Sequence, residues 1–160
     1  NLPLLSVSSF RVSLTVIILQ RTDTAVSLCS FKPITDHPAF HSNIDIDNIL
    51  DFSWVEEESL EKMGEESLTF AKLLVSGTIE HIEEIDSIIK DHLSRWDFDR
   101  LNKVDLAILR ISVYPLLYQK DLHSSIVIDE AIDISKDFGS DDSYKFINAV
   151  LDNVRKSQAS

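Results

Sequence analysis

Residues 126–154 carry the pattern that most limits how this chain can fold. Apolar side chains recur there at spacings of three and four, the period of helices that bury one face. The pattern is interrupted at Phe-Gly-Ser, residues 138–140. Glycine at this point suits a left-handed helix end, and serine followed by Asp141 and Asp142 suits the start of a new helix. We therefore predict two amphipathic helices joined by a short hinge.

A longer helical pattern precedes this pair and is predicted to end near His92. Its apolar stripe consists of Leu68, Ala71, Val75, Thr78, Ile82, Ile85 and Ile89. Four acidic residues, Glu80, Glu83, Glu84 and Asp86, are predicted to lie on the opposite side. We interpret them as a solvated helix face.

A central helix is predicted to begin at Asn102, which stands three residues before Asp105 as in a capping box. Pro115 removes a backbone donor, so this helix should kink or stop near Tyr114. The buried side is predicted to contain Leu101, Val104, Ile108, Ile111 and Leu116.

The last two helices are predicted to follow a polar turn over residues 120–124. Ser124 or Ser125 would cap the first of them, whose apolar residues are Val127, Ala131, Ile134 and Phe138. The second would start at Ser140 and bury Phe146, Ile147, Val150, Leu151 and Val154.

Composition favours an all-α fold with one domain. The chain has 160 residues, 44% of them hydrophobic, and only three glycines, fewer than sheet proteins with many tight turns use. Residues 51–160 hold twelve basic and twenty-three acidic side chains. Because such a body repels a phosphate backbone, nucleic-acid binding would need a local basic patch or a cationic partner.

The first part of the chain has a different character. Residues 12–19 are β-branched and partly alternating, which favours a strand by propensity, but no other strand is predicted to pair with it. We expect residues 10–21 to be recruited as a helix or the segment to be poorly ordered. The predicted divisions are an atypical segment at 1–45, a helical domain at 46–156 and a frayed tail at 157–160.

Residue types that support catalysis are not grouped in the sequence. It contains no glycine-rich phosphate loop, no nucleophile elbow and no repeated metal motif, so a non-catalytic protein without cofactor or metal is predicted. His37 and His41 are separated by a proline, and His81 with Glu84 is interpreted as a solvated pair. The single cysteine, Cys29, and the short apolar run at 12–19 indicate a cytoplasmic protein.

Several extended segments resemble the NusB family of bacterial transcription antitermination factors. They are LDFSW at residues 50–54, DHLSRWDFDRL at 91–101, VDLAILRISVY at 104–114 and the two helical segments at 126–154. The resemblance implies a bundle of about six to seven helices in two packed subdomains. It also implies binding to the boxA element of nascent RNA together with NusE, a basic ribosomal protein, in support of ribosomal RNA transcription.

By position, the resemblance places Asp142, Lys145, Phe146 and Asn148 near the RNA, because they occupy the family's D-S-x-K-F-x-N motif. A helix start with a lysine and an aromatic ring suits an unstacked base and its phosphate. From the residues alone, a phenylalanine at helical spacing with Val150 is more often core than a stacking platform, and Asn148 could satisfy a backbone group.

The resemblance also places Asp99 and Asp105 toward NusE, although Asp105 could simply serve the helix cap. Where the family has an arginine-rich opening, this chain has Arg11 and Arg21, so Arg11 is the remaining candidate for a phosphate contact there. Pro115 is a second departure, within the family's central helix.

Two alternatives are kept open. The same fold occurs as the RNA-binding domain of certain ribosomal RNA cytosine methyltransferases, so the chain could be a detached module of that kind. It could also be a helical protein-interaction module that does not bind RNA.

Overall fold

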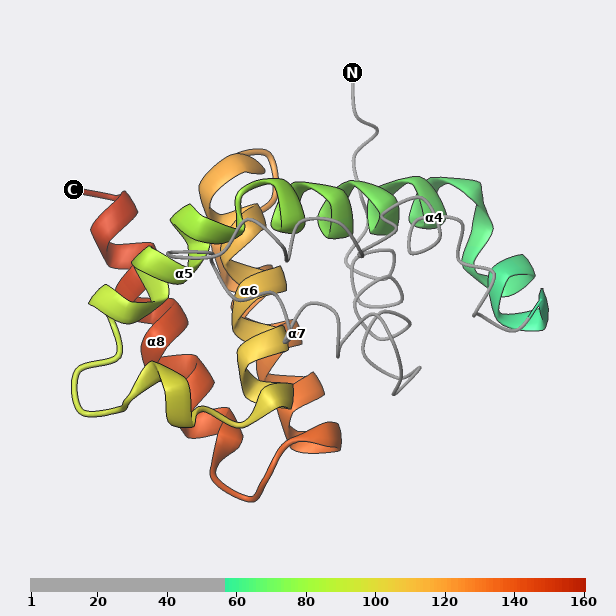
Figure 1. Ribbon diagram of the computed structural model, residues 1–160. Coiled ribbons are helices and arrows are strands. Elements are labelled where there is room, and N and C mark those ends of the chain that lie inside the picture. The colour runs from blue at the N-terminus through green and yellow to red at the C-terminus, as the bar shows by residue number, and fades with distance from the viewer. Residues whose placement is uncertain (1–56) are drawn as a thin grey trace, which may run out of the picture.

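A computed structural model describes residues 57–160, and within them the chain forms helices and no strand (Figure 1). The elements are α4 (Glu57–Glu80), α5 (Ile82–Asp91), the short 3-10 helix η2 (Phe98–Arg100), α6 (Lys103–Tyr118), α7 (Ser124–Phe138) and α8 (Ser143–Gln158). The predicted all-α class is confirmed. The predictions for residues 1–45, including Arg11, Cys29 and the segment 10–21, lie outside the described residues.

Helix α6 forms the centre of the bundle. It contacts α4, α5, α7 and α8, and Figure 1 shows α4 crossing above it and running outward from the other helices. Every residue from Asp105 to Leu116 is buried. We had predicted buried residues on one side of α6 only. Because other helices pack around α6, its residues are buried on every side.

Pro115 does not end α6, which continues to Tyr118. The backbone N–H of Gln119 donates to the Pro115 carbonyl at 2.9 Å, so helical bonding resumes directly after the proline. Of the predicted kink or stop near Tyr114, the stop was wrong. The proline removes one donor close to the helix end, and burial of Leu116 against the core stabilises the last turn.

The long predicted helix is divided at His81 into α4 and α5. His81 has φ −106° and ψ 21°, although backbone bonds still link it to Gly77 and Ile85. The predicted stripe is confirmed, with Leu68 half-buried and the other members buried. Close packing occurs at Gly77, where a Cβ atom would lie 2.1 Å from Cζ of Tyr114. The glycine therefore lets α4 approach α6.

Asp86 departs from the predicted acidic face. Glu80, Glu83 and Glu84 are exposed as expected, but Asp86 and Arg110 are each 1% exposed and form a two-point ion pair between α5 and α6. The two carboxylate oxygens of Asp86 accept hydrogen bonds from Arg110, one from Nε at 2.8 Å and the other from Nη2 at 2.7 Å. The helical repeat explains why Asp86 is buried, because it lies on the same helix face as the core residues four before and three after it.

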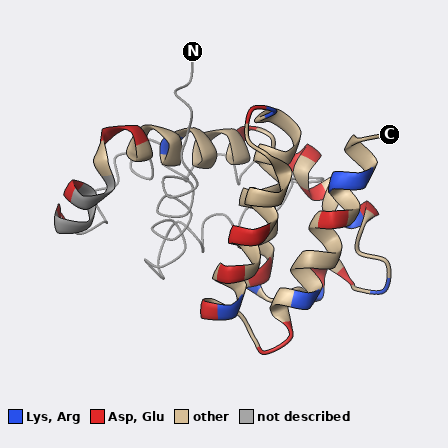
Figure 2. Cartoon of the chain, turned by 180° about the vertical axis from the view of Figure 1, so that it is seen from behind, with Lys and Arg blue, Asp and Glu red and all other residues tan. Residues whose placement is uncertain are grey.

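Most other charged residues in the described part lie on the outside of the helices, and Asp105 and Glu130 are the buried exceptions. Figure 2 shows aspartate and glutamate on several helices, with lysine and arginine interspersed among them. No described helix is long and apolar enough to cross a membrane.

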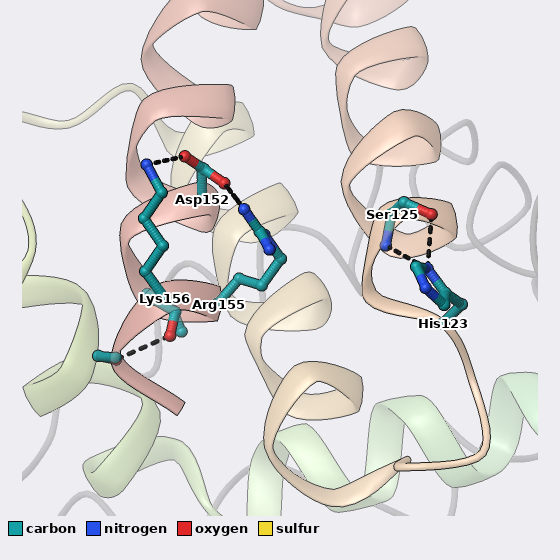
Figure 3. A network of polar contacts seen from close by, with 7 residues as sticks. His123, Ser125, Asp152, Arg155 and Lys156 are labelled. Atoms are coloured by element: carbon teal, nitrogen blue, oxygen red, sulfur yellow. Dashed lines mark hydrogen bonds and ion pairs between the residues drawn. The ribbon is translucent and has the colours of Figure 1, made fainter. Parts of the chain in front are cut away.

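The cap of α7 is His123, one residue before the predicted serines. Its Nδ1 accepts from the Ser125 N–H at 3.2 Å and lies 2.7 Å from the Ser125 hydroxyl, while Ser124 is the first helical residue (Figure 3). The apolar face of α7 is confirmed, with Val127, Ala131 and Ile134 buried and Phe138 partly buried.

Helix α8 begins at Ser143, and its N-cap residue is Asp142, two residues after the predicted cap Ser140. Asp141 and Asp142 therefore precede the helix. All five predicted apolar residues of α8 are buried. Near its other end, Asp152 accepts hydrogen bonds from Arg155 at 2.6 Å and pairs with Lys156 at 2.7 Å (Figure 3). These two cations, Lys156 more than Arg155, lower the pKa of Asp152.

Candidate nucleic-acid interface

In the hinge before α8, Gly139 packs closely against Ser135 and Ser143. Gly139 has φ −86° and ψ −175°, so it is extended and the predicted left-handed conformation was wrong. Glycine is needed there for space, because a Cβ atom would lie 2.6 Å from both the Ser135 carbonyl and Cβ of Ser143. The Ser140 N–H donates to the Ser143 hydroxyl at 2.9 Å, and the two hydroxyls are 3.0 Å apart. Ser140 therefore binds the first residue of α8 from outside the helix.

The first turns of α8 place three of the predicted RNA-proximal side chains at the surface. Asp142, Lys145 and Asn148 are exposed. The Lys145 ammonium donates to Asp142 at 2.9 Å, and this hydrogen bond together with the carboxylate charge raises the pKa of Lys145. The lysine is therefore a permanent cation at neutral pH. Its ammonium also lies 5.6 Å from the centre of the Tyr144 ring.

Phe146, the fourth predicted residue, is only 8% exposed and belongs to the hydrophobic core. Its ring meets the indole of Trp96 edge-on, with centroids 4.8 Å apart and an interplanar angle of 65°. Trp96 comes from the loop between α5 and η2 and is 50% exposed. The aromatic surface beside α8 is thus provided by Trp96, with Phe146 behind it.

Trp96 was not a predicted site residue, although the sequence offered a signal. It belongs to a segment with large rings between charges, WDFDR, at residues 96–100. Its loop is bent by Ser94, which has φ 55°, and the Trp96 N–H donates to the Leu93 carbonyl at 3.1 Å. Only the fold shows that this loop reaches Phe146 on α8.

The two predicted partner-facing carboxylates have different environments. Asp99 is exposed in η2, and its N–H donates to Asp97 at 3.1 Å. Asp105 is 8% exposed at the start of α6, and Oδ1 has no partner among the described residues. Burial raises the pKa of Asp105, partly offset by a hydrogen bond with Ser143 of α8. Asn102 caps α6 as predicted, accepting from the Val104 N–H at 2.8 Å.

The described residues contain no group of three or more metal-binding side chains. His81 and Glu84, read from the sequence as a solvated pair, are 3.7 Å apart and are joined through Tyr118. The Tyr118 hydroxyl donates to Glu84, contacts the His81 ring nitrogen at 3.1 Å and has a raised pKa, chiefly because of Glu84. This arrangement is an aromatic contact on the surface rather than a ligand set.

Comparison with known proteins gives one consistent result. The model of the NusB family matches residues 34–156. The transcription antitermination protein NusB of Treponema denticola is 56% identical over 110 residues, which cover 69% of this chain and 79% of that protein.

Solved structures agree with the sequence comparison. NusB of T. maritima matches with a TM-score of 0.60 and 28% identity, covering 92% of this chain and 90% of that one. A structure of the antitermination factors NusB and NusE in complex with double-stranded RNA matches with a TM-score of 0.64 and 26% identity, covering 94% and 97%.

Proposed function

The chain belongs to the NusB family, and we propose that it acts as a transcription antitermination factor that binds boxA-type nascent RNA together with NusE and so supports ribosomal RNA transcription. The observation that carries the proposal is the 56% identity over 110 residues with a protein named for this function. The similarity of the chain to a NusB protein in a structure with NusE and RNA supports the same proposal. We assign the protein a binding role without catalysis.

The charge of the chain explains why a partner is needed. A net charge of −12 repels the phosphate backbone on average. A basic ribosomal protein bound beside α8 would supply the positive potential that the chain lacks, and the chain would supply shape and specific contacts. Antitermination activity would then depend on the pair.

We assign the RNA-proximal role to Asp142, Lys145, Phe146 and Asn148 on the first turns of α8, with Arg11 as a phosphate contact. Lys145 and Asn148 are exposed and can reach RNA directly. Phe146 acts through the aromatic surface that it supports.

We assign the NusE-facing role to Asp99 and Asp105, near the start of α6. Asp99 offers an exposed carboxylate to a cationic side chain. Asp105 lies beneath the surface and would hold the α6 start against Ser143 of α8.

A titration of labelled boxA-like RNA tests the function. Fluorescence anisotropy is measured with this protein alone, with NusE alone and with both, and a scrambled RNA of equal length is the control. We expect weak binding by the protein alone and a gain of at least about tenfold, near 1.4 kcal/mol, with both proteins. Binding that does not exceed that of NusE alone would contradict the proposal and favour an interaction module that does not bind RNA.

The methyltransferase-module alternative is not favoured. The Treponema denticola relative is named as an antitermination protein, and the chain spans 79% of its length.

A further inference from the structure

We propose that Trp96 is a stacking surface for an unpaired RNA base, next to the start of α8. The inference rests on the proposed function and adds a contact residue that neither the motif nor the family resemblance had indicated. Trp96 is the most exposed of the large hydrophobic side chains in the described part of the chain, at 50%. The half-exposed indole leaves ring surface that a ligand can cover.

The indole of Trp96 is already held in position, so little conformational entropy is lost when a base binds to it. Phe146, which contacts the indole edge-on, is itself part of the core between α8 and the other helices. The loop that carries Trp96 is held by a backbone bond to Leu93. Because the ring is already positioned, a base that stacks on it does not need to order a flexible side chain.

The other exposed ring in the described part provides a contrast. Tyr118 is 40% exposed, but its hydroxyl is bonded to Glu84 and its ring packs on His81 with centroids 4.3 Å apart. Tyr118 therefore already has intramolecular partners on its polar and aromatic sides, which makes it a matched control.

The local charges favour a base over a phosphate as the group that binds. Arg95 is exposed beside Trp96, but Arg100 lies 3.7 Å from Asp97, and Lys145 is paired with Asp142. Cations and carboxylates alternate around the indole, so what the ring adds to the phosphate contact of Lys145 is stacking on a base. Stacking requires only a ring face and is therefore compatible with this acidic protein.

The chain has two tryptophans, so fluorescence can identify the one that meets RNA. The probe is single-stranded boxA-like RNA added to the protein with NusE. We expect tryptophan quenching to persist in Trp54→Phe and to disappear in Trp96→Phe. NusE with RNA but without this protein corrects for any signal from the partner.

Affinity gives a second measurement. We expect Trp96→Ala to weaken RNA binding in the presence of NusE roughly tenfold, and Trp96→Phe to restore most of it, because any aromatic face can stack. Tyr118→Ala should leave RNA affinity unchanged. Binding of each variant to NusE without RNA is measured in parallel on a sizing column.

The outcomes separate this inference from the function on which it rests. If the unmodified protein with NusE does not bind the RNA, the proposed function fails. If it binds and Trp96→Ala binds equally well, only the stacking role is overturned. If Trp96→Ala instead loses NusE in the absence of RNA, Trp96 is a protein contact and the inference is also overturned.

Discussion

Phe146 and Trp96 touch each other but have opposite exposures, and this difference should be visible in stability. Phe146→Ala is expected to lower the free energy of unfolding by about 3 kcal/mol, because it leaves a cavity within the core. Trp96→Ala, at a half-exposed position, should cost about 1 kcal/mol or less. Urea unfolding followed by circular dichroism measures both. Similar losses for the two variants would contradict the assignment of one ring to the core and the other to the surface.

The buried pair of Asp86 and Arg110 should show a different signature. Asp86→Ala is expected to destabilise the protein by about 3–5 kcal/mol, because the guanidinium stays buried without its carboxylate. Asp86→Leu combined with Arg110→Met should recover most of that loss, since the double change removes both charges. Urea unfolding of the two variants is the measurement, with Glu83→Ala on the exposed side of α5 as the control. A double variant no more stable than the single one would show that the pair is not held by its charges.

The same pair shows what the residues alone could and could not reveal. Because of its charge, we predicted Asp86 on the solvated face, although its spacing of four from Ile82 and three from Ile89 puts it on the apolar face. The carboxylate is stable there only because Arg110, on another helix, meets it at two points. A partner 24 positions away in sequence cannot be identified from local patterns.

At the level of helices, periodicity was a reliable guide and helix ends were not. The buried faces of α7 and α8 were predicted because a 3.6-residue repeat of apolar residues is typical of helices that bury one side. The caps moved by one or two residues, because His123 and Asp142 occupy the N-cap positions that we had predicted for nearby serines. For the candidate site, the motif located the start of α8, but the contact between Trp96 and Phe146 joins two distant segments.

The junction between α6 and α8 should respond to pH through Asp105. Burial raises the pKa of this carboxyl above its unfolded value of 3.8, so the folded state binds its proton more tightly. Its contribution to stability is therefore complete below the unfolded pKa and is lost as pH rises through the folded pKa. Asp105→Asn, which keeps an acceptor for Ser143, should remove this loss and be the more stable protein at neutral pH.

Urea unfolding at a series of pH values from 3 upward measures the effect as the difference between the parent and Asp105→Asn. Taking the difference cancels other groups, including Asp152, whose lowered pKa changes stability with pH in the opposite direction. Asp99→Asn, which removes an exposed carboxylate, is the matched control. A variant that loses stability at neutral pH would show that the carboxylate of Asp105 stabilises the junction.

The protein as a unit is acidic, so its affinity for RNA should depend on a few local cations rather than on its overall field. Lys145→Ala in the presence of NusE is expected to weaken boxA-like RNA binding and to reduce the slope of log affinity against log salt by roughly one unit. Lys72→Ala on α4 changes the net charge equally at an exposed position on another helix. Anisotropy titrations at several salt concentrations measure both slopes. If Lys72→Ala reduced the slope as much as Lys145→Ala, long-range charge would account for binding and the start of α8 would have no special part in it.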